Sequence, residues 1–515
     1  MRRCWFLAFA AIAGCGRFGF GDVDHRADSA VTNGDGDITG DGGATLRFSY
    51  LKPMNTETFD RFGFAIALSA DGKTLAVGAP AEDCGIVGVN ASDGSNNGVS
   101  QSGAVYIFAR SGPGWVQQAY IKPSTVDIND AFGAALALSG DGNTLAVGVP
   151  NEDSAARTIG GTESDNSALE SGAVFVFART NTTWSQQAYI KSSNSDAGDE
   201  FGWAVALTGT GDMLAVGVPQ EDGGSMGGGG DPSSNTAMDS GAVITFTRSG
   251  ATWTQDAYIK PSNTGAGDLF GNTLSIAEDG ATLVVGAPAE DSGATIAIGS
   301  STVGSQLDNS VTEGGAAYIF VLGAGMWYQQ GYLKPDKIDF GDFFGKVVSI
   351  SSDGNTVAAA SPGEDTIANS GAVSTFTRSA DIWTAQQKLK AANAGDNDQF
   401  GVSLALSGDG TKLMVGAPFE DSNGISLGGN PNDNSSSDSG AVYAFVRGAS
   451  WSQTSYSKGN APDPGDQWGY AVAISRDGTT RSVSAAYEDS AATGINGNAL
   501  DNTAQDSGCA GVSNY

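Results

Sequence analysis

Histidine and cysteine are almost absent from this chain: His25 is the single histidine among 515 residues, and there are four cysteines. A Ser-His-Asp or Cys-His catalytic arrangement needs a histidine beside its nucleophile, so neither can form in the part of the chain beyond residue 45. A zinc site built on histidine is excluded there as well. We therefore expect no enzyme. One alternative stays open, because paired carboxylates can hydrolyse glycosides without histidine.

Positive charge is also scarce, with 26 Lys and Arg against 57 Asp and Glu and a net charge of −31. Nucleic-acid binding depends on clustered Lys and Arg, so a nucleic-acid partner is excluded. The acidic balance also opposes docking on anionic lipid headgroups. It keeps an exported protein soluble and can attract divalent cations or cationic partners. Solubility is the simpler interpretation of the charge as a whole.

No segment is both long and apolar enough to cross a bilayer as a helix; the apolar stretch from Trp5 to Ile12 is too short. It follows Arg2 and Arg3, and small residues lead from it to Cys15. This order resembles the signal segment of bacterial lipoproteins, which implies cleavage before Cys15 and a lipid on its thiol. An ordinary secretory signal and a chance cysteine are the alternatives.

Three regions follow from this resemblance. We expect a lipoprotein signal peptide over residues 1–14, a flexible Gly/Asp-rich tether over residues 15–44, and a folded domain over residues 45–515. The protein is then exported and held in the bacterial cell envelope, with the outer membrane or cell surface as the expected location. It would touch the membrane only through the N-terminal lipid, and we expect a monomer.

Few cysteines remain for a disulfide framework. Once Cys4 leaves with the signal and Cys15 carries the lipid, only Cys84 and Cys509 can pair. They lie in the first and last of the repeats described next. Sequence alone cannot place their Cα atoms within bonding range, so a bridge and two free thiols both stay open.

The dominant feature that is present is a repeat of about 70 residues, each opened by an aromatic residue and a glycine. The opening residues are Phe62, Phe132, Phe201, Phe270, Phe344, Phe400 and Trp468, which by subtraction are 70, 69, 69, 74, 56 and 68 residues apart. A constant internal period of this kind is typical of a repeat architecture.

The first repeat predicts four antiparallel strands. Phe64 to Leu68 alternates in character with period two, and Asp71-Gly72 predicts a tight hairpin. Leu75 to Pro80 returns as an apolar strand that ends at proline. Ser102 to Phe108 and Trp115 to Pro123 are the third and fourth predicted strands. No window in the repeats shows a sustained helical period, so the chain is predicted to be all-β.

Packing and closure predict a β-propeller with seven blades. The innermost strands alternate small and large residues, so each sheet has one small and one large face that can nest against its neighbours. The last repeat ends after its third strand, Ser507 to Val512, while Leu46 to Pro53 reads like a fourth strand. We predict that this N-terminal strand completes the last blade. Arg481, Ser482 and Ala486 depart from the pattern, so that blade is expected to be the loosest.

The motifs Phe62-Gly63, Val77 to Pro80 and Ser102 to Tyr106 recur in the same order in the other repeats. They resemble FG-GAP repeats, the unit of the integrin α-chain propeller and of many bacterial extracellular proteins. The resemblance covers roughly residues 45–515 and implies a seven-bladed propeller with a cell-surface binding role. Many family members bind calcium in the hairpin between strands 1 and 2. Here that hairpin, Ser69 to Lys73, offers a single carboxylate, whereas calcium takes about six to eight oxygens.

Acidic residues also recur at two places that a propeller brings to one face. An aspartate stands two residues before each opening aromatic: Asp60, Asp130, Asp199, Asp268, Asp342, Asp398 and Asp466. A Glu-Asp pair follows each second strand: Glu82-Asp83, Glu152-Asp153, Glu221-Asp222, Glu290-Asp291, Glu364-Asp365, Glu420-Asp421 and Glu488-Asp489. The pairs could hold Ca²⁺ with Asp and Asn further along each loop, which makes calcium the one candidate cofactor. Backbone capping is the favoured alternative, because oxygen-only sites lack diagnostic spacing.

Tryptophans on the predicted fourth strands suggest a carbohydrate platform. They are Trp115, Trp184, Trp253, Trp327, Trp383 and Trp451, and five of them follow a third strand that ends in arginine. A cation–π contact across the hairpin explains these pairs structurally and is the favoured interpretation.

The loops between second and third strands differ most between repeats, and variable loops on a rigid scaffold are where binding specificity usually lies. Gly223 to Asp239 is a long example, whereas Thr366 to Asn369 is short. We therefore predict a binding, adhesion or protein-interaction module whose ligand, a protein or a glycan, the sequence does not name. A passive structural protein of the envelope and a carboxylate-based glycoside hydrolase are the alternatives.

Overall fold

The computed structural model describes residues 48–91, 94–227, 230–294, 306–424 and 433–514. They belong to one compact unit, Leu46–Tyr515. The predicted signal peptide, the lipidation site Cys15, the tether and part of the glycine run after Met226 lie outside the described residues. No helix in the described part of the chain is long and apolar enough to span a membrane.

The named elements are 28 strands in seven four-stranded antiparallel sheets. The first three blades hold β2 (Ala65–Leu68), β3 (Thr74–Ala79), β4 (Ala104–Ser111) and β5 (Gly114–Ile121); β6 (Ala135–Leu138), β7 (Thr144–Val149), β8 (Ala173–Thr180) and β9 (Thr183–Ile190); and β10 (Ala204–Leu207), β11 (Met213–Val218), β12 (Ala242–Ser249) and β13 (Thr252–Ile259). The next two hold β14 (Thr273–Ile276), β15 (Thr282–Ala287), β16 (Ala316–Gly323) and β17 (Met326–Leu333); and β18 (Val348–Ile350), β19 (Thr356–Ser361), β20 (Ala372–Ser379) and β21 (Ile382–Leu389). The sixth holds β22 (Ser403–Leu406), β23 (Lys412–Ala417), β24 (Ala441–Arg447) and β25 (Trp451–Ser457), and the seventh holds β26 (Val472–Ile474), β27 (Thr480–Ala485), β28 (Cys509–Asn514) and β1 (Phe48–Leu51).

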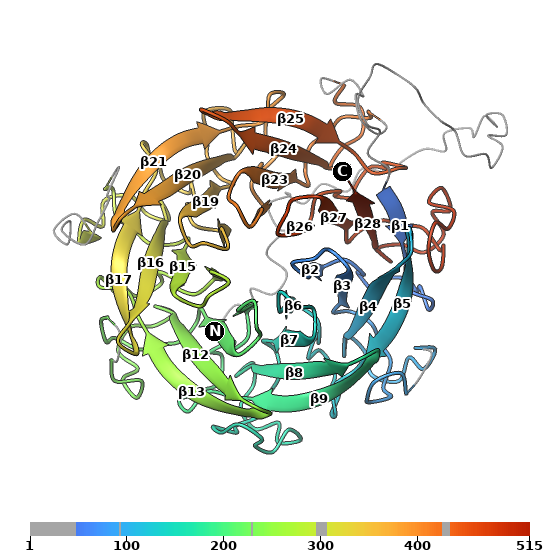
Figure 1. Ribbon diagram of the computed structural model, residues 1–515, viewed down its shortest axis with the longest axis horizontal. Helices are drawn as coiled ribbons and strands as arrows, with labels where there is room; N and C mark the ends of the chain where they lie inside the picture. The colour runs from blue at the N-terminus through green and yellow to red at the C-terminus, as the bar shows by residue number, and fades with distance from the viewer. Residues whose placement is uncertain (1–47, 92–93, 228–229, 295–305, 425–432, 515) are drawn as a thin grey trace, which may run out of the picture. The chain divides into compact units, whose positions relative to one another are not determined.

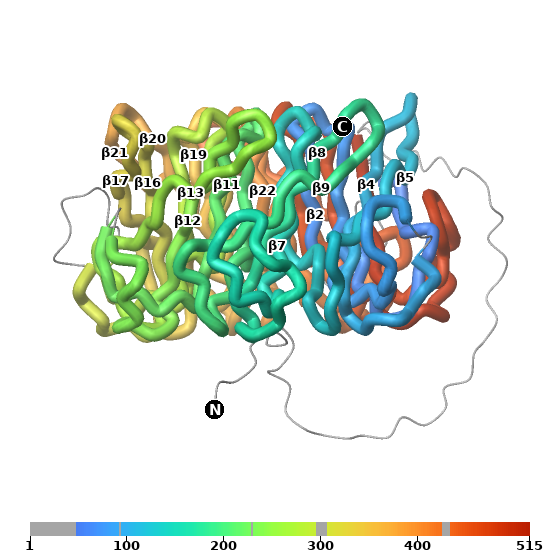
Figure 2. The backbone as a smooth tube through the Cα atoms, turned by 90° about the horizontal axis from the view of Figure 1, so that it is seen from below, coloured from blue at the N-terminus to red at the C-terminus, as the bar shows by residue number. Residues whose placement is uncertain are grey.

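The seven sheets stand around a common axis, with the first strand of each repeat innermost and the fourth on the rim (Figure 1). This confirms the predicted all-β, seven-bladed propeller. Because consecutive strands run antiparallel, hairpins 1–2 and 3–4 of every blade lie on one face, which we call the hairpin face. The long 2–3 loops and the 4–1 connections lie on the other, the loop face (Figure 2).

The N-terminal strand closes the ring as predicted. β1 pairs with β28 in antiparallel register, from Phe48 opposite Ser513 to Leu51 opposite Ala510. In Figure 1 the blue strand β1 lies directly beside the red β28. The third strand of the last blade is therefore covered by chain from the other end of the domain, and the edge that it would otherwise expose is removed.

The three signature motifs of the repeat meet at the junction between blades. Gly172, in a Ser-Gly-Ala motif, has φ +77, and a Cβ there would lie 2.1 Å from the carbonyl oxygen of Phe201 in the next blade. A Cβ on Gly148, in a Val-Gly motif, would lie 2.0 Å from the carbonyl oxygen of Gly202. The Phe201 amide in turn donates to the Ser171 carbonyl at 3.1 Å. Only glycine permits this close backbone approach, so the motifs recur because the junction recurs.

Buried clusters lie between neighbouring sheets, as the alternation of small and large residues predicted. Ala67 and Ala76 of the first blade pack with Leu136, Leu145 and Val147 of the second. The opening aromatics fill the same layer: Phe132, for example, makes edge-to-face contacts with two aromatics of its own third strand at 5.8 and 5.9 Å. Since each sheet buries its faces only against its neighbours, the blades stabilise one another.

On the hairpin face, the seven 1–2 hairpins are joined in a closed ring of backbone hydrogen bonds. The donor and acceptor residues are Ala70 to Gly140, Asp141 to Gly209, Gly209 to Glu278, Glu278 to Ser352, Ser352 to Gly408, Gly408 to Arg476, and Arg476 back to Ala70. These hairpins surround a central cavity of about 160 Å³. Across it, Arg476 Nη1 pairs with Glu278 Oε1 at 2.9 Å. A Cβ on Gly209 would lie 2.2 Å from Glu278 Cγ, so glycine makes room for this side chain.

In the last blade, a larger side chain fills space that a smaller residue leaves where the blade departs from the repeat pattern. Its third strand has Gly511 where the first blade has Tyr106, and its opening residue is Trp468 instead of Phe. A Cβ on Gly511 would lie 2.6 Å from Trp468 Cη2, so the larger ring occupies space that the tyrosine fills elsewhere. Arg481 and Ser482 are buried within β27. The two remaining cysteines, Cys84 in the first blade and Cys509 in the seventh, are buried and form no disulfide, so the bridge that the sequence left open is not formed.

Candidate functional site

The glutamate of every Glu-Asp pair lies inside a blade rather than at the surface. In the second blade Glu152 Oε2 accepts a hydrogen bond from Lys191 Nζ at 2.9 Å, and its Oε1 accepts one from the Tyr189 hydroxyl at 2.7 Å. The lysine is fully buried and also donates to Ser171 Oγ at 2.7 Å. The side chain that sequence analysis offered as a metal ligand is therefore already neutralised by a lysine of the fourth strand.

The same triad of Lys, Glu and Tyr recurs around the ring. The other members are Lys122, Glu82 and Tyr120; Lys260, Glu221 and Tyr258; Lys334, Glu290 and Tyr332; Lys458, Glu420 and Tyr456; and Lys52, Glu488 and Tyr50. Burial lowers the pKa of Lys191 and raises the pKa of Tyr189. The seventh triad joins β1 to the rest of its blade, so closure of the ring has an ionic component as well as a strand ladder.

The fifth blade departs from the triad. It has Lys388 at the tyrosine position, and both Lys388 and Lys390 pair with Glu364. Although burial acts to raise it, hydrogen bonds from these lysines and from Thr366 lower the pKa of Glu364 to about 2. These pairings were not predicted from the sequence. The available signal was a lysine that recurs two residues after a tyrosine at the end of the fourth strand, in step with a recurring glutamate.

The aspartates of the Glu-Asp pairs cap the end of the loop that they begin. Asp153 Oδ1 accepts the backbone N–H of Glu170 at 2.8 Å. The corresponding bonds join Asp83 to Gln101, Asp222 to Asp239, Asp291 to Glu313, Asp421 to Asp438 and Asp489 to Asp506. The fifth blade, which has the shortest of these loops, is not among them. This is the capping interpretation of the sequence pattern.

The aspartates that precede each opening aromatic are capping residues too. Asp130 Oδ2 accepts the backbone N–H of Asp127, three residues earlier, at 3.2 Å. The same bond joins Asp60 to Glu57, Asp199 to Asp196, Asp268 to Gly265, Asp342 to Asp339, Asp398 to Gly395 and Asp466 to Asp463. Burial raises the pKa of Asp130 to about 7, and nearby carboxylates add to the shift. For Asp199 burial raises the pKa to about 8.

These contacts account for the acidic repeat without a metal ion. Within the described ranges, no group of three or more His, Cys, Asp or Glu side chains is arranged to hold one. The hairpin aspartate between strands 1 and 2 is occupied as well: Asp71 Oδ1 accepts the Ser69 hydroxyl and the Lys73 amide at 2.7 and 3.0 Å. Calcium binding at the Glu-Asp pairs stays a prediction that a metal-binding measurement must decide.

The fourth-strand tryptophans are buried at the rim junctions. All six are at most 4% exposed, so their faces are not open to a sugar. Arg179 lies over the Trp184 ring at 5.2 Å, and the pairs Arg248–Trp253, Arg378–Trp383 and Arg447–Trp451 repeat this contact. Trp184 Nε1 also donates to Gln118 Oε1 of the preceding blade at 3.0 Å. The cation–π interpretation is confirmed for these four of the five Arg–Trp pairs.

An aromatic and cationic group lies where the innermost strands of the seventh and first blades begin on the loop face. Arg61 lies over the Tyr487 ring at 5.2 Å; Tyr487 contacts Tyr470 at 5.7 Å, and Tyr470 contacts Phe64 at 5.3 Å. We call these four residues the entrance cluster. Burial and the neighbouring Tyr487 raise the pKa of Tyr470.

The positions of the entrance cluster vary from blade to blade. The residue equivalent to Arg61 is Ala131, Glu200, Leu269, Phe343, Gln399 or Gln467, and the residue equivalent to Tyr487 is Ala81, Asn151, Gln220, Ala289, Gly363 or Phe419. These positions are thus free of the structural constraints that keep the Glu, Lys and Asp positions nearly constant. A ligand-specific surface needs such freedom.

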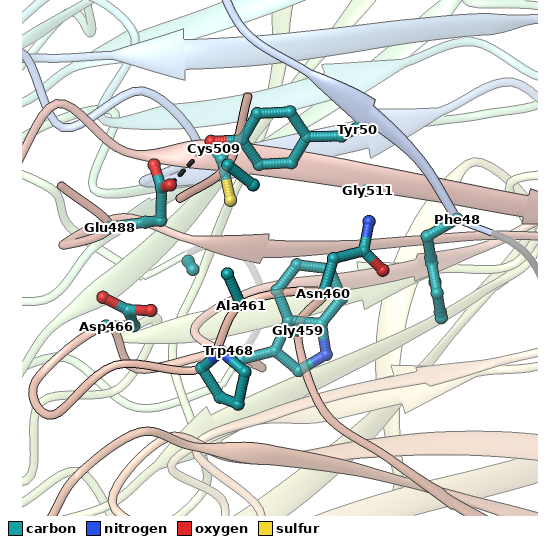
Figure 3. Close-up of a pocket in the computed structure, with 13 residues that line it drawn as sticks. Phe48, Tyr50, Gly459, Asn460, Ala461, Asp466, Trp468, Glu488, Cys509 and Gly511 are labelled. Carbon is teal, nitrogen blue, oxygen red and sulfur yellow. Dashed lines mark hydrogen bonds between the residues drawn. The ribbon is translucent and has the colours of Figure 1, made fainter. Parts of the chain in front are cut away.

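The seventh blade contains one small cavity, of about 10 Å³ (Figure 3). Tyr50 donates to Glu488 Oε1 at 2.6 Å on one side, and Trp468, Asp466 and Cys509 line the rest. A cavity of this size holds about one water molecule. It arises where Ala461 and Gly511 replace the Asn and Tyr that meet in the fourth and sixth blades, so we assign it to packing rather than to a ligand.

A family model described as the FG-GAP repeat matches residues 184–232, 253–320 and 383–445. The chain carries FG-GAP repeats. Each matched FG-GAP segment begins at the tryptophan of a fourth strand (β9, β13 or β21) and continues through at least the first two strands of the following blade. The matched unit therefore straddles a junction, which is where the constant motifs of this propeller make their contacts.

Two solved structures resemble the FG-GAP propeller weakly. One is hydrazine synthase of Kuenenia stuttgartiensis, with 13% identity and a TM-score of 0.45 over 88% of this chain and 100% of that one. Another is a candidate 6-phosphogluconolactonase of Bacteroides uniformis, with 14% identity and a TM-score of 0.44 over 78% of this chain and 88% of that one. Likeness at this level carries no inference about activity. Among curated proteins, none matches this sequence significantly.

Proposed function

We propose that this FG-GAP propeller is a binding module of the bacterial cell envelope, tethered by a lipid on Cys15 and presenting its loop face to a partner. One observation carries the proposal. The polar residues that recur in every repeat form ion pairs and hydrogen bonds within the blades, whereas residues that vary between repeats lie on the loop face. The entrance cluster is the clearest group of these. Adhesion to another cell or surface is one form that such binding would take.

The chemistry of the entrance cluster supports binding rather than catalysis. A guanidinium stacked on tyrosine rings offers N–H donors, π faces and apolar edges, the groups that recur at binding hot spots. The carboxylates available for acid–base work are instead tied up: each Glu of a Glu-Asp pair is bonded to lysine, and each Asp before an aromatic caps a backbone amide. A carboxylate hydrolase would need a pair of carboxylates free to face a substrate.

Calcium is not required by this proposal. Lysine already supplies the positive charge that a cation would bring to each Glu-Asp pair. Stiffening of the loops by calcium is an addition to the proposal, tested separately below.

The test is capture of a partner by the lipidated full-length chain from surface extracts of the producing cell, compared with the double variant Arg61→Ala/Tyr487→Ala. Tyr328→Ala is the matched control, because Tyr328 is 49% exposed on the rim strand β17, away from the entrance cluster. We expect a partner that the double variant loses and the control keeps. A passive structural protein would capture nothing specific. Incorporation of labelled fatty acid, lost in Cys15→Ser, tests the anchor.

A further inference from the structure

At each junction on the loop face, one of the backbone hydrogen bonds between the two loops joins equivalent positions. The amide of a 4–1 connection donates to a carbonyl of the 2–3 loop of the preceding blade. The pairs are Phe59 to Gln505, Asn129 to Ser100, Gly198 to Leu169, Gly267 to Met238, Gly341 to Thr312, Asn397 to Ala368 and Gly465 to Ser437. Seven equivalent points thus surround the axis on this face.

At six of these seven points, an exposed large apolar side chain sits on the bonded residue or next to it. These residues are Phe59, Ile128, Leu169, Met238, Phe340 and Ile367, between 40% and 74% exposed, and we call them the junction crown. At the seventh junction, between the sixth and seventh blades, the described residues include no such side chain. Side chains this exposed contribute little to the core, and they recur at equivalent junctions on one face of the propeller.

The crown is not a simple consequence of the repeat, because its members come from either side of the junction. Where the 2–3 loop supplies a polar residue, such as Ser100 or Thr312, the 4–1 connection supplies Ile128 or Phe340. Where the 2–3 loop supplies the apolar residue, the 4–1 connection has a small one: Leu169 faces Ala197 across its junction. The feature that six of the seven junctions share is one large exposed apolar side chain, not one sequence position.

Carboxylates accompany the crown. The residue after the bonded carbonyl of the 2–3 loop is acidic at five junctions: Glu170, Asp239, Glu313, Asp438 and Asp506. All five have positive φ, between 50° and 54°, where a glycine would be less strained. Each also donates its backbone amide to an aspartate of a Glu-Asp pair, so each of these points carries two acidic residues. Burial and the neighbouring Asp421 raise the pKa of Asp438.

We infer that the junction crown and its carboxylates form a docking surface for a partner protein that presents basic and apolar side chains together. The inference rests on the proposed binding function and names the partner's chemistry. The net charge of −31 attracts a basic partner and repels anionic lipid, and the crown supplies the apolar anchors that charge alone lacks. The contact is polar at the loops and apolar at the junction points, as in ordinary protein interfaces.

The experiment uses three labelled amphipathic peptides as probes: Lys with Leu, Lys with Ser at the same charge, and Glu with Leu. The full chain is compared with the crown variant Leu169→Ser/Met238→Ser/Phe340→Ser. The control variant is Met326→Ser/Tyr328→Ser/Ile382→Ser, whose residues are similarly exposed on β17 and β21. A third variant, Glu170→Gln/Asp239→Asn/Glu313→Gln, removes charge alone. Circular dichroism and thermal melting establish that every variant is folded.

We expect the Lys/Leu peptide to bind best and the crown variant to weaken it about tenfold, the loss of one to two anchors. The control variant should stay within about twofold, and the charge variant should weaken binding and flatten its salt dependence. Equal effects of the crown and control variants would overturn the inference, as would equal binding of the Lys/Ser peptide. Crown-dependent binding to phosphatidylcholine vesicles would overturn it in favour of a membrane surface.

The proposed binding function and the proposed docking surface can be refuted independently of each other. A captured partner that depends on Arg61 and Tyr487 but ignores the crown variant leaves the binding module standing and removes the crown. Crown-dependent peptide binding without any captured partner supports the surface chemistry and counts against the proposed cellular function.

Discussion

Breaking one buried triad should cost the propeller a large share of its stability. Lys191 Nζ is fully buried and bonds to Glu152 Oε2 and Ser171 Oγ at 2.9 and 2.7 Å. In Lys191→Met the Glu152 carboxylate keeps its Tyr189 hydroxyl but loses its counter-charge. Removing one partner of a buried ion pair costs about 3–5 kcal/mol, because the remaining charge is stranded away from water.

Neutralising the stranded charge should recover much of that loss. In Lys191→Met/Glu152→Gln the Tyr189 hydroxyl still has an oxygen acceptor, and no unpaired charge remains. Replacing both partners of a buried pair is often close to neutral, so we expect the double variant to be more stable than Lys191→Met alone. Lys73→Met is the matched control: its pair with Asp71 is 64% and 50% exposed, and it should change stability by less than about 1 kcal/mol.

Equilibrium urea unfolding, followed by tryptophan fluorescence, measures the free energy of unfolding of five chains: the wild type, Lys191→Met, Glu152→Gln, the double variant and Lys73→Met. The reasoning is refuted if Lys191→Met lies within about 1 kcal/mol of the wild type, or if the double variant is as unstable as the sum of its single variants. Either result would mean that water or rearrangement neutralises Glu152, and that the triad does not hold the blade.

Four further outcomes follow from individual contacts. Burial raises the pKa of Asp199 from 3.8 to about 8, so the folded state holds a proton that the unfolded chain has lost. The stability of the propeller should therefore fall as the pH rises from about 4 through about 8. In thermal melts, Asp199→Asn should flatten this dependence of stability on pH. Gly511→Ala should lower stability by about 1–3 kcal/mol, because the new Cβ meets Trp468 at 2.6 Å, and Trp468→Phe in the same chain should restore it; no rescue would show that the ring is not the obstacle. Glu278→Gln should cost less than about 1 kcal/mol, with the difference shrinking in high salt, since the arginine of its pair is 58% exposed. Chelation with EDTA should leave the melting temperature and loop proteolysis unchanged; a drop that calcium restores would establish the metal at the Glu-Asp pairs.

Many residues of the candidate site could be predicted from the sequence, but the role of each residue could not. The Glu-Asp pairs and the aspartates before the aromatics were visible as recurring carboxylates, and the aspartates make the backbone hydrogen bonds that the capping interpretation describes. The entrance cluster was not visible, because Arg61 and Phe64 meet Tyr470 and Tyr487 only after the ring has closed. Residues more than 400 positions apart become neighbours there, and no local pattern relates them.

What the amino-acid sequence determined by itself is the architecture: the number of blades, their strands, and closure by Phe48–Leu51. These depend on alternation, turn residues and a constant period, which are local and repeat seven times, so chance agreement is excluded. What only the tertiary structure decided is the use of each polar group. The packing of strands and loops decides whether Glu152 pairs with a lysine or with a metal ion. It also decides whether Leu169 or Ala197 is exposed at a junction. Pairing and exposure are properties of packed neighbours, and the chain order does not carry them.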